Sequence, residues 1–242
     1  MTQPTIIAAQ TKGYAQSGAV STGQVRTYDD IVIPASANTV IMMVNSSSDE
    51  TGVEIVSINY GNASAVKIHD IDVSPPTNLT PCRVVVFDVS AVSADMTADV
   101  TMTFSNNNVS RSTRLGVICT TGFVESWAAY TDDNVTDAQP QMYSPNYANN
   151  IMVLSGSLGR DSTDLAVSKG TLDFLDEVAD DKPGVFGISQ ATNESDNSKE
   201  MAFTMSAEEH NGVVFAISTQ RNPFATNFGP VIRPIISHDV IS

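Results

Sequence analysis

Apolar residues recur along the chain in short runs, which are rich in Val, Ile, Phe and Thr and are separated by clusters of Gly, Asn, Asp, Ser and Pro. Runs of this length and composition are typical of β-strands and turns. The pattern predicts an all-β fold of about ten to twelve strands. The predicted strands cover residues 25–33, 39–44, 53–60, 64–69, 83–89, 99–104, 115–123, 151–155, 165–174, 185–189, 201–205 and 213–219.

The faces of these strands indicate a sandwich. Val100, Met102 and Phe104 share one face of their strand, while the intervening threonines share the other. One dry and one wet face predict an antiparallel, jelly-roll-like β-sandwich. The runs at 40–44 and 84–87 are apolar throughout, so we expect them to lie centrally or under a partner subunit.

Helical periodicity is confined to residues 171–180, where Leu172, Leu175 and Val178 lie three residues apart. This spacing predicts either a short amphipathic helix or a strand end followed by an acidic loop.

The two halves of the chain carry similar strand motifs. Asn38 and Asn149 each precede a buried run at a separation of 111 residues, Ser105 and Ser206 end similar runs 101 residues apart, and the run from Leu115 resembles the run 98 residues later. Either the halves are duplicated or unrelated strands look alike. Duplicated strands would form the two sheets of one sandwich or two stacked sandwiches. Because the second half lacks a complete strand count of its own, we expect one shared core.

Both ends of the chain differ from the middle. We expect an N-terminal arm at 1–24, a sandwich at 25–219 with 25–130 and 149–219 as its related halves, and a C-terminal arm at 220–242. Three prolines exclude a regular helix or a central strand from the C-terminal arm. Exposed apolar side chains are a liability on a free monomer, so we expect a partner chain or the same subunit to hold this arm. The candidate partner-binding residues are Phe224, Phe228, Val231, Ile232, Ile235 and Ile236.

The formal charge is −15, from 12 basic and 27 acidic residues. A protein that grips a phosphate backbone needs clustered cations, so nucleic acid is excluded as an expected ligand. No run approaches the roughly 20 apolar residues that span a bilayer, and the N-terminus lacks the features of a signal peptide. We expect a soluble protein that contacts no membrane and is not exported by a cleaved signal.

Few residues are suited to catalysis or metal binding. Cys82 and Cys119 lie in apolar runs and read as free buried thiols, and no spacing of Cys and His predicts a zinc site. Ser237, His238 and Asp239 have the residue types of a hydrolase triad, but adjacency in sequence does not build one, and no GxSxG turn is present. The clustered carboxylates follow no calcium-loop spacing and read as solvated loop charges. We therefore expect no enzyme, no cofactor and no metal.

Trp127 and Tyr130 form the one aromatic pair that suggests a ligand. Such a pair predicts either a platform on which a sugar ring stacks or aromatic residues at the rim of a protein interface.

The order of several motifs resembles a known module. They are Val56-Ser-Ile-Asn-Tyr-Gly-Asn, Arg83-Val-Val-Val-Phe, Ala98-Asp-Val-Thr-Met-Thr-Phe-Ser and Gly116-Val-Ile-Cys-Thr-Thr-Gly-Phe. Their succession over about residues 36–220 resembles a β-sandwich module of tailed-bacteriophage virion proteins and of some bacterial surface proteins. The resemblance implies a jelly-roll-like sandwich used for assembly or binding, with no catalytic residues. The single-glycine turn at Gly61 and the two arms depart from its pattern, which disfavours a free-standing sugar-binding module.

Three functional hypotheses remain, of which the first two follow from the resemblance and the third from the aromatic pair. The first is a multi-copy capsid decoration or cement protein, assembled in the host cytoplasm, that binds neighbouring virion subunits and further copies of itself through its sandwich and arms. The second places the protein in the phage tail, as a tube, collar or fibre-associated subunit. The third is a carbohydrate-binding or adhesin module that uses Trp127 and Tyr130.

Overall fold

The computed structural model describes residues 3–15, 25–46, 53–60, 63–64, 66–73, 82–91, 94–104, 112–132, 137–138, 141–142, 150–158, 165–176, 184–191, 199–200, 202–204 and 210–220. All regular elements in these ranges are β-strands, and every strand pairing is antiparallel. The predicted all-β, antiparallel sandwich is confirmed. No helix in the described part of the chain has the length and apolar character needed to cross a membrane.

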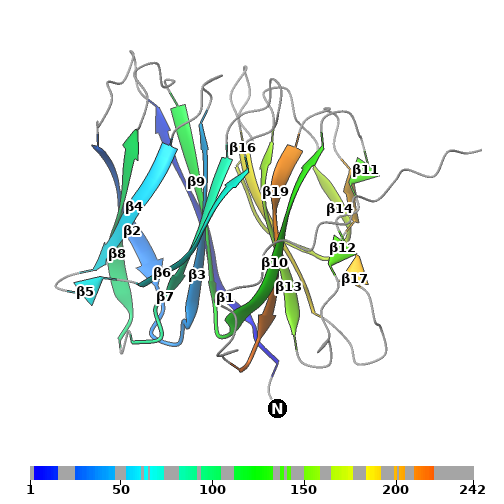
Figure 1. Cartoon of the computed structure of the whole chain (residues 1–242), viewed down its shortest axis with the longest axis horizontal. Helices are drawn as coiled ribbons and strands as arrows, with labels where there is room; N and C mark the ends of the chain where they lie inside the picture. The colour runs from blue at the N-terminus through cyan, green and yellow to red at the C-terminus, as the bar shows by residue number, and fades with distance from the viewer. Residues whose placement is uncertain are drawn as a thin grey trace, which may run out of the picture.

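Four sheets make up the body, which we name by their position in the stack (Figure 1). Outer sheet 1 has the order β2 (Val25–Ile33), β8 (Met96–Phe104), β4 (Val53–Tyr60) and β5 (Ala63–Ser64). Inner sheet 1 has the order β1 (Ile6–Ala15), β9 (Ser112–Thr120), β3 (Thr39–Ser46), β7 (Cys82–Asp88) and β6 (Val66–Val73).

The second half contributes the other two sheets and a small ladder. Inner sheet 2 has the order β10 (Phe123–Asp132), β19 (His210–Ser218), β13 (Ile151–Leu158), β16 (Gly184–Ala191) and β15 (Thr171–Asp176). Outer sheet 2 has the order β11 (Asp137–Ala138), β18 (Ala202–Thr204) and β14 (Ala166–Lys169). The ladder pairs β12 (Gln141–Met142) with β17 (Lys199–Glu200).

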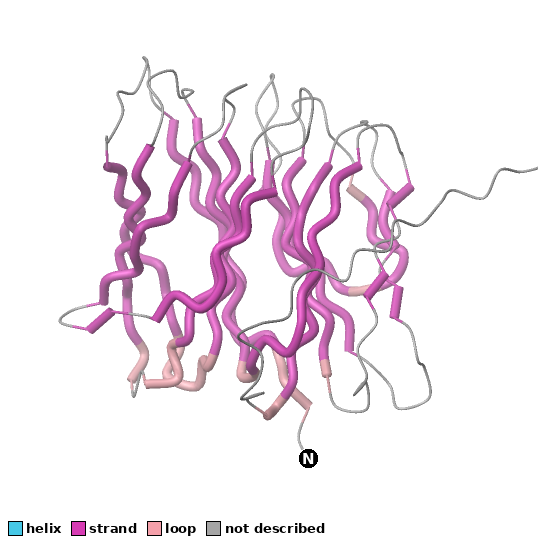
Figure 2. The backbone as a smooth tube through the Cα atoms, in the orientation of Figure 1, coloured by secondary structure: helices cyan, strands magenta, loops and turns pink. Residues whose placement is uncertain are grey.

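Three separate cores fill the spaces between the layers, which stand side by side in Figure 2. The first core lies between outer and inner sheet 1 and includes Ile31, Met42 and Phe87. The central core joins the two inner sheets, and the second core lies between inner and outer sheet 2 around Phe186 and Phe203. The structure therefore contains two stacked sandwiches, and the expectation of one shared core was wrong. Each half has its own outer sheet. The outer strands of the second half are only two to four residues long, so the hydrophobic pattern did not reveal that sheet.

Strands pair in a nested order within the first half. β1 pairs with β9, β2 with β8, β3 with β7 and β4 with β5, so the chain folds back on itself like one long hairpin. Nesting of this kind is also how a jelly roll is wound.

The second half repeats this arrangement. Replacing β1, β9, β3, β7 and β6 by β10, β19, β13, β16 and β15 converts the order of inner sheet 1 into that of inner sheet 2. β-Bulges interrupt three pairs of corresponding strands, β1 and β10, β4 and β14, and β6 and β15. Bulges are specific features of a fold rather than defects, so their recurrence extends the correspondence between the two halves beyond strand order.

The sequence motifs had matched the halves one residue out of phase. A separation of 111 pairs Val40, which faces the first core, with Ile151, which faces the central core. A separation of 98 likewise pairs Val117 with Phe215, which also face different cores. A slip of one residue moves a side chain to the opposite face of a strand. Corresponding residues of β3 and β13 are therefore an even number of residues apart, and those of β9 and β19 an odd number apart.

Several predicted boundaries also differ from the structure. Residues 1–24 were expected to form an arm, but Ile6–Ala15 form β1, an edge strand paired with β9. The predicted strand at 115–123 is divided by the turn at Thr121 and Gly122, and that at 165–174 by Gly170, whose φ is 123°. The candidate helix at 171–180 begins as strand β15, in agreement with its second interpretation. The C-terminal arm lies outside the described residues from 221 onward.

Candidate interaction surfaces

The two inner sheets pack against each other through a self-complementary face. β1 lies over β15, β9 over β16, β3 over β13, β7 over β19 and β6 over β10. This set of contacts is symmetric. When each strand is replaced by its counterpart in the other half, the contact of β1 with β15 becomes the contact of β10 with β6, and both are present. An interface with this property has the organisation of a twofold homodimer interface. The chain therefore carries within itself the contact that would join two subunits.

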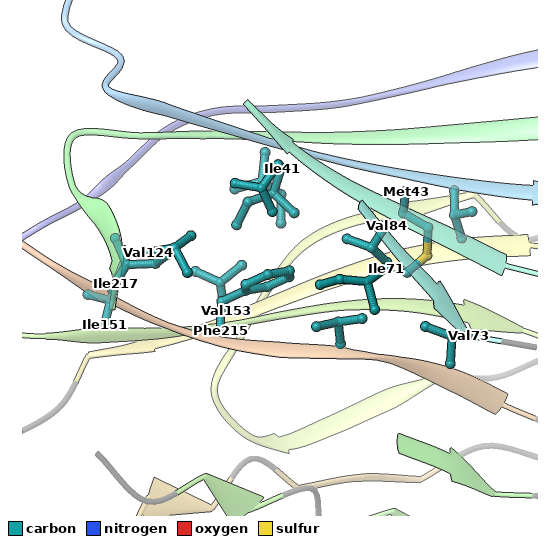
Figure 3. Close-up of a cluster of buried hydrophobic side chains, with 14 of the residues drawn as sticks. Ile41, Met43, Ile71, Val73, Val84, Val124, Ile151, Val153, Phe215 and Ile217 are labelled. Atoms are coloured by element: carbon teal, nitrogen blue, oxygen red, sulfur yellow. The ribbon is translucent and has the colours of Figure 1, made fainter. Parts of the chain in front are cut away.

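Side chains from both inner sheets meet in the central core, and Figure 3 shows Ile41 and Met43 on the opposite side of the core from Val153 and Phe215. All four are fully buried. Both faces of β3 and β7 are thus covered, one by this core and one by the core of their own sandwich. The prediction that the apolar runs at 40–44 and 84–87 lie centrally is confirmed.

Phe174 reaches from β15 across the central core and lies in a space left by two glycines. A Cβ atom added to Gly187, on the adjacent strand, would lie 2.4 Å from its Cε1 atom. A Cβ atom added to Gly116, on β9 of the opposite sheet, would lie 2.5 Å from its Cζ atom. The ring therefore fits only because both positions lack a side chain.

An aromatic contact closes the seam between β6 and β10. His69 and Trp127 form an edge contact, with ring centroids 6.2 Å apart and an interplanar angle of 61°. Burial lowers the pKa of His69, so the neutral imidazole is favoured. Asp70 follows His69 and accepts hydrogen bonds from Arg83 and from Lys67, the latter over 2.9 Å. Burial alone would raise the pKa of Asp70, but these two partners outweigh it and lower the pKa.

The opposite seam, between β1 and β15, is held by an ion pair. Arg114 Nε lies 3.2 Å from Asp176 Oδ2, which joins β9 of the first sandwich to β15 of the second. The guanidinium passes over Gly13 of β1, where a Cβ atom would lie 2.5 Å from Nη1. An aromatic pair thus closes one seam and an ion pair the other.

Asp173 introduces an acidic group into the same strand, at the bulge of β15. Its Oδ1 atom accepts a hydrogen bond of 3.0 Å from Ser189 Oγ, while its Oδ2 atom is buried and has no hydrogen-bond partner. Burial raises the pKa of Asp173 to about 6, although the Ser189 bond acts in the opposite direction.

Gln3 and Thr5, which precede β1, make hydrogen bonds to residues near the connection between the two halves. Gln3 Nε2 donates to the backbone oxygen of Asn150 over 2.8 Å, and Asn150 Nδ2 donates to Glu125 Oε2 over 2.6 Å. The backbone N–H of Thr5 donates to Thr121 Oγ1, and the backbone N–H of Thr121 donates to the oxygen of Thr5. This segment is therefore part of the body rather than an attachment arm.

Residues selected from the sequence are placed as follows. Trp127 is partly buried and packs at the rim of the central core. Tyr130 lies further along β10, and its backbone is paired with that of Gly212. Sugar stacking by this pair stays a prediction.

Cys119 is a free buried thiol, as expected, and burial raises its pKa to about 12. The candidate partner-binding residues lie outside the described residues, as does the Ser237, His238 and Asp239 triplet.

The seams were missed by sequence reasoning. Nothing in the local sequence around His69 and Arg114 indicates a partner in the other half, and only the fold brings them to the boundary between sandwiches. Glycines within apolar strands, such as Gly116 and Gly187, were the one available signal, because they indicate close approach of another group. Within the described ranges, no group of three His, Cys, Asp or Glu side chains could hold a metal ion.

No protein-family model, curated protein or solved structure matches this chain.

Proposed function

We propose that this chain is a structural protein of a tailed-phage virion, present in many copies as a capsid decoration or cement protein. The observation that carries the proposal is the continuous packing of two sandwiches through the central core. Packed interiors have low compressibility and transmit strain, so a body with three such cores suits a protein that reinforces a shell.

The distribution of charge supports the same role. Residues up to Gln220 contain ten of the 12 basic and 26 of the 27 acidic residues, which leaves the C-terminal arm with two arginines and one aspartate. A strongly acidic body keeps a high-copy subunit soluble and discourages non-specific association with other acidic surfaces. The apolar arm then supplies the contact with neighbouring subunits, and many modest contacts reinforce one another through multivalency.

The proposal is tested on purified virions of the phage whose genome encodes the chain. Quantitative mass spectrometry should find it in copy numbers comparable with those of the major capsid protein, and heads separated from tails should retain it. Recovery with the tails, or in a small fraction of the capsid copy number, would support the tail assignment and contradict decoration. Absence from the particle would contradict both virion assignments.

The attachment step has its own test. Heads stripped of the protein should rebind the full-length chain and should not rebind a variant that ends at Gln220. Equal rebinding of both would show that the sandwich alone makes the contact.

A further inference from the structure

A very short connection joins the two sandwiches. β9, the last strand of the first sandwich, ends at Thr120, and β10, the first strand of the second, begins at Phe123. Thr121 and Gly122 alone lie between them. Exchange of identical elements between copies of a chain is a low-cost route to a dimer, and short hinge loops favour it.

The contacts between the sandwiches do not require that both belong to one chain. Each sandwich has a core of its own, which includes Phe87 in the first and Phe186 in the second. The contacts between them form the separate central core and the two seams. A first sandwich can therefore receive the second sandwich of another copy through the same contacts that it makes within its own chain, so exchange gives up only the contacts of the turn.

The side chains at the boundary require one sandwich of each kind. Phe174 of the second sandwich lies in the space left by Gly116 of the first. In a pair of two second sandwiches, the counterpart of Gly116 would come from β19, whose residues in the central core are Val213, Phe215 and Ile217. Each of these has a side chain where the ring needs a glycine. Arg114 and Asp176 also come from different sandwiches, so their ion pair imposes the same requirement.

We propose that two copies of this chain exchange their second sandwiches by straightening the turn at Thr121 and Gly122, which gives a reciprocal dimer with two central cores. Hydrogen bonds from the first sandwich oppose the exchange by holding the turn closed. Thr39 Oγ1 donates to the backbone oxygen of Gly122 over 2.7 Å, and Asn38 Nδ2 donates to that of Thr121. The proposal goes beyond the proposed function and holds whether or not virions contain the protein.

Reversal of charges across the β1–β15 seam provides the direct test. A full-length chain with Arg114→Glu and one with Asp176→Lys each bring like charges together at this seam when the chain is closed. In a reciprocal dimer of the two chains, one seam joins the two substituted positions, which carry opposite charges, and the other joins the native Arg114 and Asp176. The chains are unfolded together in urea, refolded and weighed by native mass spectrometry, which distinguishes the mixed dimer from dimers of either chain.

A second pair of variants is the matched control. Asp70 accepts a hydrogen bond from Arg83 within the first sandwich, so exchange leaves both residues of this pair in the same chain. A mixture of Arg83→Glu and Asp70→Lys chains therefore cannot restore the pair. The Arg114→Glu and Asp176→Lys mixture should give at least about tenfold more mixed dimer than the control mixture, because two ion pairs are regained in each dimer. Equal yields from the two mixtures would overturn the proposal.

The wild-type chain supplies an independent measurement. After refolding at increasing protein concentration, light scattering should show a rising fraction of dimer. Thr39→Val should raise the dimerisation constant at least about fivefold, because it removes a hydrogen bond that only the closed turn makes. Asp95→Ala should leave that constant unchanged, since Asp95 accepts a hydrogen bond from the backbone of Ala35 at another turn. A wild-type chain that refolds only as a monomer at every concentration would overturn the proposal, whatever the folding of the variants.

Discussion

Gly116→Ala tests whether Phe174 fastens the two sandwiches together. The new Cβ atom would lie 2.5 Å from Cζ and 2.6 Å from Cε2 of the Phe174 ring, far inside normal contact. The ring is confined on its other side by the backbone at Gly187, where a Cβ atom would be 2.4 Å away. Overpacking of this kind costs about 1–3 kcal/mol. Alanine restricts the unfolded chain more than glycine does, which offsets up to about 1 kcal/mol, so we expect a net loss of about 1–2 kcal/mol.

A double-mutant cycle separates this clash from other effects of the added methyl group. Phe174→Ala alone should cost about 3–4 kcal/mol, because a nearly buried aromatic side chain is removed from the central core. In that background Gly116→Ala meets no ring and should be neutral or slightly stabilising, which gives a coupling energy of about 2 kcal/mol. Ile31→Val, in the first core, is the control and should add independently to Phe174→Ala.

Urea unfolding at equilibrium measures these free energies. Trp127 is the one tryptophan of the chain and packs against the central core, so its fluorescence reports on the contact between sandwiches. Circular dichroism follows the strands in parallel. If Gly116→Ala costs the same amount with and without the Phe174 ring, the reasoning about this contact is refuted.

Three further predictions concern the seams and edges. Because the Asp173 pKa is raised to about 6 in the folded state, the unfolded state releases this proton at lower pH, so the Asp173 contribution lowers stability as pH rises from about 4 to about 6. Asp173→Asn should therefore be more stable than wild type above pH 6, by about 1 kcal/mol after allowance for solvent screening, and an unchanged difference across pH 4–7 in urea titrations would contradict this. Gln10→Ala should cost about 1 kcal/mol of unfolding free energy, because the Gln10 side chain makes hydrogen bonds of 2.8 and 3.2 Å to the backbone of Val32 on edge strand β2. Gln3→Ala should cost about 0.5–1 kcal/mol and speed hydrogen exchange near Asn150, whereas equal exchange would show that this hydrogen bond holds nothing.

Strand existence could be predicted from hydrophobic pattern, but strand phase could not. In β3, Val40 and Met42 face the first core while Ile41 faces the central core, and all three are fully buried. Alternation of polar and apolar residues normally reveals which face is inside, and a strand buried on both faces has no such alternation. The similarity of β3 and β13 was therefore visible in the sequence, although the alignment was one residue out of phase.

Strand β1 escaped prediction for the same physical reason. Ile7 and Ala8 pack against the first core, and Ile6 and Ala9 against the central core, so small and large apolar residues follow one another without a period. The predicted boundaries at 25–33 and 53–60 agree with β2 and β4, which belong to an outer sheet. Outer strands alternate more clearly because one of their faces meets solvent.

The seams show what becomes of a dimer-like interface inside one chain. In a homodimer both ends of a twofold interface must be made by the same residues, because one sequence supplies both subunits. Here the β6–β10 seam holds His69 and Trp127, and the β1–β15 seam holds Arg114 and Asp176. Each half can thus carry different residues at corresponding ends while strand order and bulges stay the same. The same freedom lets the two edges of the body diverge, so an ion pair at the β1–β15 seam does not require an ion pair at the β6–β10 seam.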